Sequence, residues 1–195
     1  MLANVQRFMT RSLKGIREGD NEKTKLNLMV SLSWFMSILN RLHIDIENEV
    51  WKRFSYFCSY CASCPCVCKA QKIQTRQPIT INEQKRPKTI ADFQKMFGQI
   101  YPASQRTLDH AGVHLVEEMG EVAEAILNYR GNHNDQDFKA VILESADLIS
   151  CAMGVFNSLG VDLVRDLSVV FANNCHECKQ APCMCSFAHI IQFKF

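Results

Sequence analysis

The sequence predicts an all-α protein, and three observations support this fold class. Apolar residues recur at spacings of three and four along most of the chain, which is the period of a helix that buries one face. Only 8 of the 195 residues are glycine and 5 are proline, so helix-breaking positions are few, while 47% are hydrophobic, which is enough for a core. The chain also contains an internal repeat, so we expect a helical bundle built from two repeated units.

The first half predicts three helices and a linker. We expect a helix from Leu2 to Arg17, a polar break around 15–21, and a long apolar helix from Leu26 to His43. A third helix, Ile46 to Phe57, leads into a cluster of cysteines. Residues 69–88 contain two prolines among many polar residues and read as a linker across the surface.

The second half predicts four helices. Thr89 is placed to cap the first of them, Gly160 to end the third, and 130–135 to form a polar loop between the second and third. The expected helices are Ile90–Tyr101, Ser104–Tyr129, Asp137–Leu159 and Leu163–Asn173.

The two halves carry the same cysteine pattern. The spacing C-x2-C-x4-C-x-C occurs twice, 117 residues apart, with a proline before the third cysteine each time. In the 36 positions 33–68, 11 residues are identical to those 117 positions later. We therefore predict a duplicated helical unit: a first copy at 1–68, a linker at 69–88, a second copy at 89–187 and a tail at 188–195.

Each cysteine cluster is predicted to be a structural zinc knuckle. Four thiolates within about a dozen residues suit tetrahedral Zn²⁺, and an iron–sulfur cluster or redox disulfides are the alternatives. Cys64 could compete as a ligand, whereas Cys151, on an apolar helix, is interpreted as a small core residue. The predicted ligands are Cys58, Cys61, Cys66 and Cys68 in the first knuckle and Cys175, Cys178, Cys183 and Cys185 in the second.

Acidic residues form a second constellation on two successive predicted helices. The stretch 117–121 reads EEMGE, and 144–147 reads ESAD. At about 100° per residue, Glu118 lies about 60° from the apolar stripe of its helix, Glu121 about 120°, and Glu117 further round. EExxE alone is usually a solvated helix face, but the answering ExxD favours carboxylates gathered around a cation. The predicted ligands of this divalent metal are Glu118, Glu121, Glu144 and Asp147.

The first copy cannot hold the same ion. At the offset of 117, the four acidic positions correspond to Met1, Asn4, Asn27 and Val30, none of which is a carboxylate. We interpret the first copy as a degenerate partner that completes the bundle in a pseudo-dimer.

The paired motifs EExxE and ExxD resemble the signature of the MazG-like all-α nucleoside triphosphate pyrophosphohydrolases, over roughly Thr89 to Cys175. The resemblance implies a helical bundle that binds Mg²⁺ through the four acids and cleaves a nucleotide between its α and β phosphates. It also implies that Asn174 lies near the nucleotide, although a helix cap is the alternative. Val170 stands where such relatives often carry lysine, and Arg53, at the equivalent position of the first copy, could supply the missing charge. Glu117 is a candidate base for the attacking water or an orienting residue.

Charge and hydropathy define the remaining expectations. Residues 1–88 carry 15 Lys/Arg and 7 Asp/Glu, whereas 89–195 carry 7 and 13, so the basic half could face nucleotide phosphates, a nucleic acid or the acidic half. Few aromatic residues accompany the cysteines, so nucleic-acid binding is not favoured.

The apolar stretch 28–39 is too short to span a bilayer, and we expect a cytoplasmic protein with no membrane contact. A further homodimer is left open.

The functional alternative to an enzyme is a non-catalytic zinc-binding adaptor or regulator that binds a nucleotide or protein partner.

Overall fold

The computed structural model describes residues 1–193, and in this range the chain forms eight α-helices and no β-strand, which confirms the all-α class. Two short 3-10 turns, η1 (Glu83–Lys85) and η2 (Ala103–Gln105), lie between helices. The helices are α1 (Leu2–Glu18), α2 (Asn21–Arg41), α3 (Ile46–Phe54), α4 (Ile90–Ile100), α5 (Leu108–Asn132), α6 (Asp135–Leu159), α7 (Leu163–Val170) and α8 (Phe187–Ile190).

Local caps explain where the helix ends differ from those expected. Asp20 accepts a hydrogen bond from the backbone N–H of Lys23 at 2.9 Å, so α2 begins five residues before Leu26. Thr107 caps α5 in the same way, and the expected start at Ser104 was wrong because that residue belongs to η2. Ser55 adopts a left-handed conformation (φ 39°) and ends α3 three residues early.

Two of the expected caps are confirmed. Thr89 and Asp92 form a capping box at the start of α4, in which each side chain accepts a hydrogen bond from the other residue's backbone N–H. Gly160 ends α6 with φ 67°, a conformation that favours glycine. At the end of α7, the helix stops at Val170 rather than Asn173.

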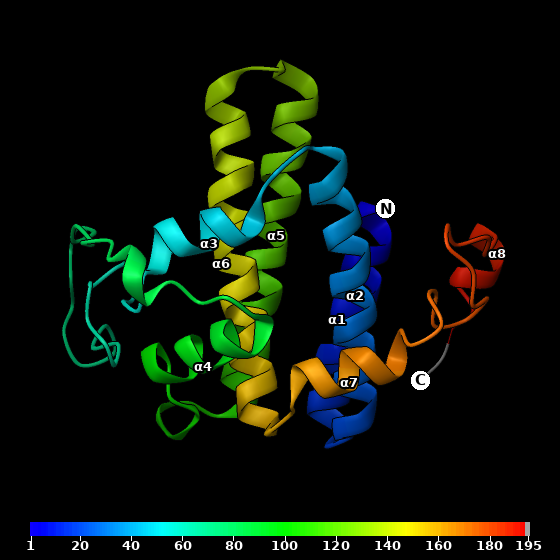
Figure 1. The fold of residues 1–195 in the computed structure, drawn as a ribbon, viewed down its shortest axis with the longest axis horizontal. Helices are drawn as coiled ribbons and strands as arrows, with labels where there is room; N and C mark the ends of the chain where they lie inside the picture. Colours follow the sequence, from blue (N-terminus) through cyan, green and yellow to red (C-terminus); the bar gives the residue numbers. More distant parts are fainter. Residues whose placement is uncertain (194–195) are drawn as a thin grey trace.

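The bundle consists of two long helical hairpins that stand side by side (Figure 1). The first copy forms the hairpin α1–α2 and the second copy forms α5–α6, and α1 packs against α5. One hydrophobic core runs through both hairpins, from Val5 in α1 to Phe156 in α6 and Leu163 in α7. The two copies therefore share a core instead of forming separate ones.

In each copy, the helix that follows the long hairpin reaches the other copy. Helix α3 follows α2 in the chain but packs against α6, where Trp51 and Phe54 are almost fully buried. Helix α7 follows α6, packs against α4 and reaches α2, where an ion pair of 3.2 Å joins Lys25 of α2 to Asp166 of α7 (Figure 1). We call α3 and α7 the exchanged helices. At the offset of 117 they are equivalent, and each begins at an aspartate cap, Asp45 and Asp162.

The linker and the tail both contact the bundle. In the linker, Glu83 accepts a hydrogen bond of 2.9 Å from the indole N–H of Trp51, so the segment is fastened to α3. In the predicted tail, Ile190 and Phe193 are buried with Phe8 and Val30 in a second, smaller core. Residues 194 and 195 of the tail lie outside the described residues.

Within residues 1–193, α6 alone is long and apolar enough to cross a membrane. In its most apolar window, 67% of the residues are buried inside the protein, as expected for the central helix of a bundle.

Candidate active-site cleft and metal centres

Helices α5 and α6 bring three of the predicted acidic ligands together. Each of Glu118, Glu144 and Asp147 offers a carboxylate oxygen within 4.8 Å of the other two. Glu144 and Asp147 lie three residues apart on one face of α6, and Glu118 faces them from α5. We call these three residues the acidic cluster.

Within the acidic cluster, Glu118 has a buried carboxylate oxygen, Oε2, that lacks a hydrogen-bond partner in the described part of the chain. Burial, followed by the charges of Asp147, Glu121 and Glu144, raises the pKa of Glu118 to about 7. Burial and the same acidic neighbours also raise the pKa of Glu144. A buried oxygen without a donor, among carboxylates that repel one another, fits a hard divalent cation such as Mg²⁺.

A cation from the first copy already lies at the cluster. Arg53, on the exchanged helix α3, donates two parallel hydrogen bonds to Asp147, one from Nε to Oδ1 at 2.7 Å and one from Nη2 to Oδ2. Burial alone would lower the pKa of the Arg53 guanidinium. The hydrogen bonds and the negative charge of Asp147 together have the larger effect, so the pKa is raised. Arg76, which follows the first knuckle, is 3.9 Å from Asp147 and about half exposed.

The remaining acids of the EExxE motif lie at the edge of the cluster or outside it. Glu121 is exposed and does not belong to the three-residue group, although it is close enough to Glu144 to raise the pKa of that residue. Glu117 is exposed and pairs with His114 one turn earlier, at 3.0 Å. As a candidate base it would therefore have to act from outside the acidic cluster.

The acidic cluster opens into a cleft of about 560 Å³ that also contains the first cysteine knuckle. Glu118 and Asp147 form one part of its wall, and Cys58, Cys66 and Cys68 form another. Its remaining polar and aromatic lining includes Tyr60, Lys69, Arg76, Tyr101, Arg106 and His110. Carboxylates can bind a divalent metal, and basic side chains attract phosphate groups. A cleft that contains both therefore suits a ligand whose phosphates bind a metal ion.

Both cysteine groups have the geometry of a tetrahedral metal site. All four sulfurs of each knuckle lie within 4.8 Å of one another. A Zn–S bond of about 2.3 Å places tetrahedral sulfurs about 3.8 Å apart. The Sγ–Sγ distance is 3.7 Å for Cys58–Cys68 and 3.9 Å for Cys61–Cys66. These sulfurs are too far apart to be a disulfide, which requires about 2 Å.

The two knuckles share one backbone path. The carbonyl of Ser63 accepts a hydrogen bond from the N–H of Cys58, and the carbonyl of Gln180, its equivalent at the offset of 117, accepts one from Cys175. The sulfur distances of the second knuckle, Cys175–Cys185 and Cys178–Cys183, are both 3.9 Å. In this knuckle, backbone N–H groups, including that of Met184, lower the pKa of Cys178 to about 6. The repeat in sequence is therefore also a repeat in structure.

The structure does not bring Asn174 to the acidic cluster. It lies, exposed, in a separate hollow between the second knuckle and α2, beside Ser33 and Trp34. This hollow is the counterpart of the cleft, because Ser33 and Trp34 correspond to Ser150 and Cys151 at the offset of 117. Since α7 and the second knuckle cross to the first copy, a residue at their junction faces the degenerate half.

In the degenerate half, neutral and apolar residues occupy the equivalent positions. Asn4 and Asn27 are buried, and Val30, the counterpart of Asp147, packs in the second small core. Phe193, which packs in the same core, is the counterpart of Arg76. Extending the repeat offset past the cysteines into the tail would have found this exchange of charge for apolar surface.

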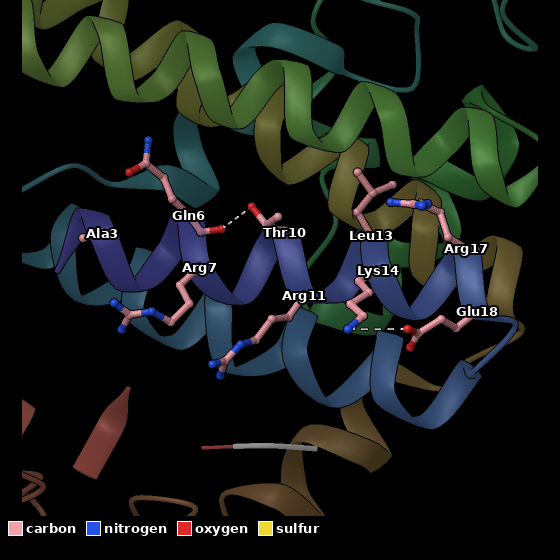
Figure 2. Close-up of a pocket in the computed structure, with 9 residues that line it drawn as sticks. All are labelled: Ala3, Gln6, Arg7, Thr10, Arg11, Leu13, Lys14, Arg17 and Glu18. Carbon is pink, nitrogen blue, oxygen red and sulfur yellow. Dashed lines mark hydrogen bonds and ion pairs between the residues drawn. The ribbon is translucent and has the colours of Figure 1, made fainter. Parts of the chain in front are cut away.

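A larger hollow, of about 670 Å³, lies along α1 and carries a basic stripe (Figure 2). Figure 2 shows Arg7 and Arg11 on the side of α1 opposite Leu13. Arg11 donates hydrogen bonds to the carbonyls of Ile191 and Phe193, and Lys14 pairs with Glu18 at 3.6 Å. The smaller cleft is the better functional candidate, because it alone of these two contains metal-ligating groups that converge.

Comparison of the chain with protein-family models, with curated proteins and with solved structures finds no match. The function of the protein is therefore inferred from the residues of the cleft.

Without Mg²⁺, the stability of the protein is expected to fall as pH rises from about 4.5 to 7. The pKa of Glu118 is about 7 in the folded protein and 4.5 for an ordinary glutamate carboxyl, as in the unfolded chain. Between these two values the unfolded chain loses this proton more readily than the folded protein, so rising pH favours unfolding. Allowing for solvent screening, the loss is about 1 to 2 kcal/mol at pH 8. Urea unfolding at pH 5 and pH 8, in chelator-free buffer, measures this loss.

Glu118→Gln should remove most of this loss, because glutamine carries no charge at either pH. Excess Mg²⁺ should restore the stability of the unaltered protein at pH 8 but not raise that of the variant equally. Identical pH dependence in the two proteins would mean that Glu118 ionises normally.

Proposed function

We propose that this protein is a Mg²⁺-dependent nucleoside triphosphate pyrophosphohydrolase with two structural zinc sites. The reaction would give a nucleoside monophosphate and pyrophosphate. The observation that carries the proposal is the convergence of Glu118, Glu144 and Asp147 beside a cleft that is also lined by the basic side chains of Lys69, Arg76 and Arg106. The resemblance of the paired motifs to the MazG-like superfamily supports the same reaction.

Glu118, Glu144 and Asp147 would hold the metal, with Glu121 at the edge. A bound Mg²⁺ would neutralise phosphate charge and polarise the phosphorus under attack. Glu117 or a carboxylate of the cluster would accept the proton of the attacking water.

Arg76 would bind the phosphates, and Arg53 would position a metal ligand. Arg76 is half exposed beside Asp147 and lies within reach of a phosphate held at the cluster. Arg53 keeps Asp147 in a fixed orientation through its two hydrogen bonds. It replaces the basic residue that the second copy lacks at Val170, so the first copy completes the site.

The adaptor alternative is favoured by one observation. The ion pair between Arg53 and Asp147 satisfies one carboxylate of the cluster without any metal. If that pairing were permanent, no divalent metal would bind Asp147, and the zinc knuckles would be the metal sites of a non-catalytic protein.

Pyrophosphate release from a panel of canonical and modified nucleotides separates the two functions. The panel is assayed with and without Mg²⁺, and the purified protein is analysed for bound metals. We expect Mg²⁺-dependent release of pyrophosphate from at least one nucleotide and two zinc ions per chain. Absence of turnover across the whole panel, with zinc present, would leave the adaptor function.

A further inference from the structure

Arg106 is the one cationic side chain of the cleft whose buried nitrogens have no hydrogen-bond partner among residues 1–193. Its Nε and Nη2 atoms are shielded from water and donate to no acceptor. These two nitrogens lie on one edge of the planar guanidinium and direct two N–H bonds in parallel. Arg53 uses the same edge for its two bonds to Asp147. In Arg106 this edge is unused, which is costly for a buried charged group.

The protein makes room for this guanidinium. A Cβ atom at Gly154 of α6 would lie 1.9 Å from Nη2 of Arg106 and 2.8 Å from its Cζ, so any side chain at this position would displace the group. The guanidinium also lies 5.6 Å from the ring centroid of Tyr101. Arg106 therefore lies at the wall of the cleft, beside a glycine and an aromatic ring.

Arg106 and the acidic cluster occupy different ends of the cleft. Gly154 follows Asp147 by seven residues on the same face of α6, which is two turns or about 10 Å along the helix. Ser150 and Cys151 line the cleft between them. A nucleotide held by its phosphates at the acidic cluster would extend its base toward Arg106.

We propose that Arg106 reads the base of the nucleotide, and that it selects a base with two adjacent hydrogen-bond acceptors. Guanine presents such a pair at O6 and N7, and cytosine at N3 and O2, whereas adenine and uracil place a donor beside each ring acceptor on their hydrogen-bonding edges. To bind the base, the guanidinium would turn about its side-chain bonds so that the unused edge faces the cleft, which Arg106 already lines. The inference rests on the proposed function for the orientation of the nucleotide.

The phosphates are a poorer partner for Arg106. Arg76 and Arg53 already lie at the acidic cluster, where the phosphates would be held, and Arg106 lies at the far end beside Tyr101 and Cys151. The aromatic ring and the small residues between the two ends suit a flat base rather than a second charged group.

Binding of the four nucleoside monophosphates, measured by titration calorimetry with Mg²⁺, tests the proposal without requiring turnover. We expect GMP or CMP to bind about 10-fold more tightly than AMP and UMP. If GMP is preferred, 7-deaza-GMP should lose the preference, and if CMP is preferred, 3-deaza-CMP should lose it, because each analogue lacks one acceptor of the pair.

Two variants separate base reading from a general effect of charge. Arg106→Lys keeps the charge but loses the planar edge, and Gly154→Ala keeps Arg106 but displaces it. Both should bring the four affinities to within about 2-fold of one another, while Arg130→Lys, an exposed control on α5, should leave the preference unchanged. Equal affinities in the unaltered protein, tightest binding of AMP or UMP, or a preference that survives Arg106→Lys would each overturn the proposal. Failure of the enzyme proposal would instead appear as absent pyrophosphate release from a protein that still discriminates the monophosphates.

Discussion

Replacing Glu144 with glutamine is expected to lower kcat/KM for Mg²⁺-dependent pyrophosphate release about 100- to 1,000-fold, the usual scale for loss of one electrostatic group in an active site. Glu144 belongs to the acidic cluster but makes no hydrogen bond to Arg53, so the substitution removes one metal ligand and leaves the pair between Arg53 and Asp147 intact. The glutamine is nearly isosteric, and the fold should be retained. Steady-state assays over a range of Mg²⁺ concentrations measure the effect.

Glu124→Gln is the matched control. Glu124 is exposed on α5, one turn beyond Glu121, and belongs to no metal-ligating group among the described residues. Its activity should stay within about 2-fold of the unaltered protein, since surface substitutions away from a site have small effects. Equal losses in the two variants, or full activity of Glu144→Gln, would remove the acidic cluster from the mechanism.

Replacing Cys61 with serine is expected to abolish both one zinc site and the activity. The first knuckle is part of the main core, and the N–H of Cys66 donates a hydrogen bond of 2.8 Å to the carbonyl of Ile100 at the end of α4. Loss of its zinc should therefore unfold this corner, because the binding energy of a structural zinc is folding energy. The melting temperature should fall by about 10 °C or more, as about 2 to 4 °C accompany each kcal/mol in a chain of this size. Lys69 and Arg76, which follow the knuckle, would leave the cleft with it.

Cys178→Ser provides the comparison, because Cys178 is the counterpart of Cys61 in the second knuckle. This knuckle lies over the degenerate half, and Cys183 in it is exposed. We expect the same loss of one zinc ion per chain by metal analysis, but a smaller fall in melting temperature and retained hydrolysis. Retained zinc and activity in Cys61→Ser would contradict the structural role of the first knuckle.

The sequence was sufficient for the fold class and for three of the four acidic residues that were predicted to converge, since Glu121 lies outside the group. Helical periodicity predicted every long helix, because each buries one continuous face, and the spacing of Glu118, Glu144 and Asp147 placed them on facing helices. The cysteine spacing likewise predicted two groups of four sulfurs. Helix ends were less predictable, since they depend on single side chains such as Asp20 and Thr107, whose hydrogen bonds are visible only in three dimensions.

The exchanged helices could not be predicted, because local periodicity says which face of a helix is apolar but not which hairpin covers it. The family resemblance implied that Asn174 lies near the nucleotide, whereas the structure places it beside Ser33 and Trp34 of the degenerate half. Arg106 was also missed. Arg106 stands out only because its unused edge lies beside Gly154, which is 48 residues later in the chain. No pattern in the sequence connects these two residues.

The crossing of α3 and α7 makes the chain a fused heterodimer whose two partners are unequal and inseparable. The second copy carries the acidic residues, and its basic partner is Arg53 of the first copy. The first copy has no carboxylate at the equivalent positions. Removing α3 would take Arg53 away from Asp147, so the acidic half of the bundle depends on a helix from the half that has no carboxylates at these positions.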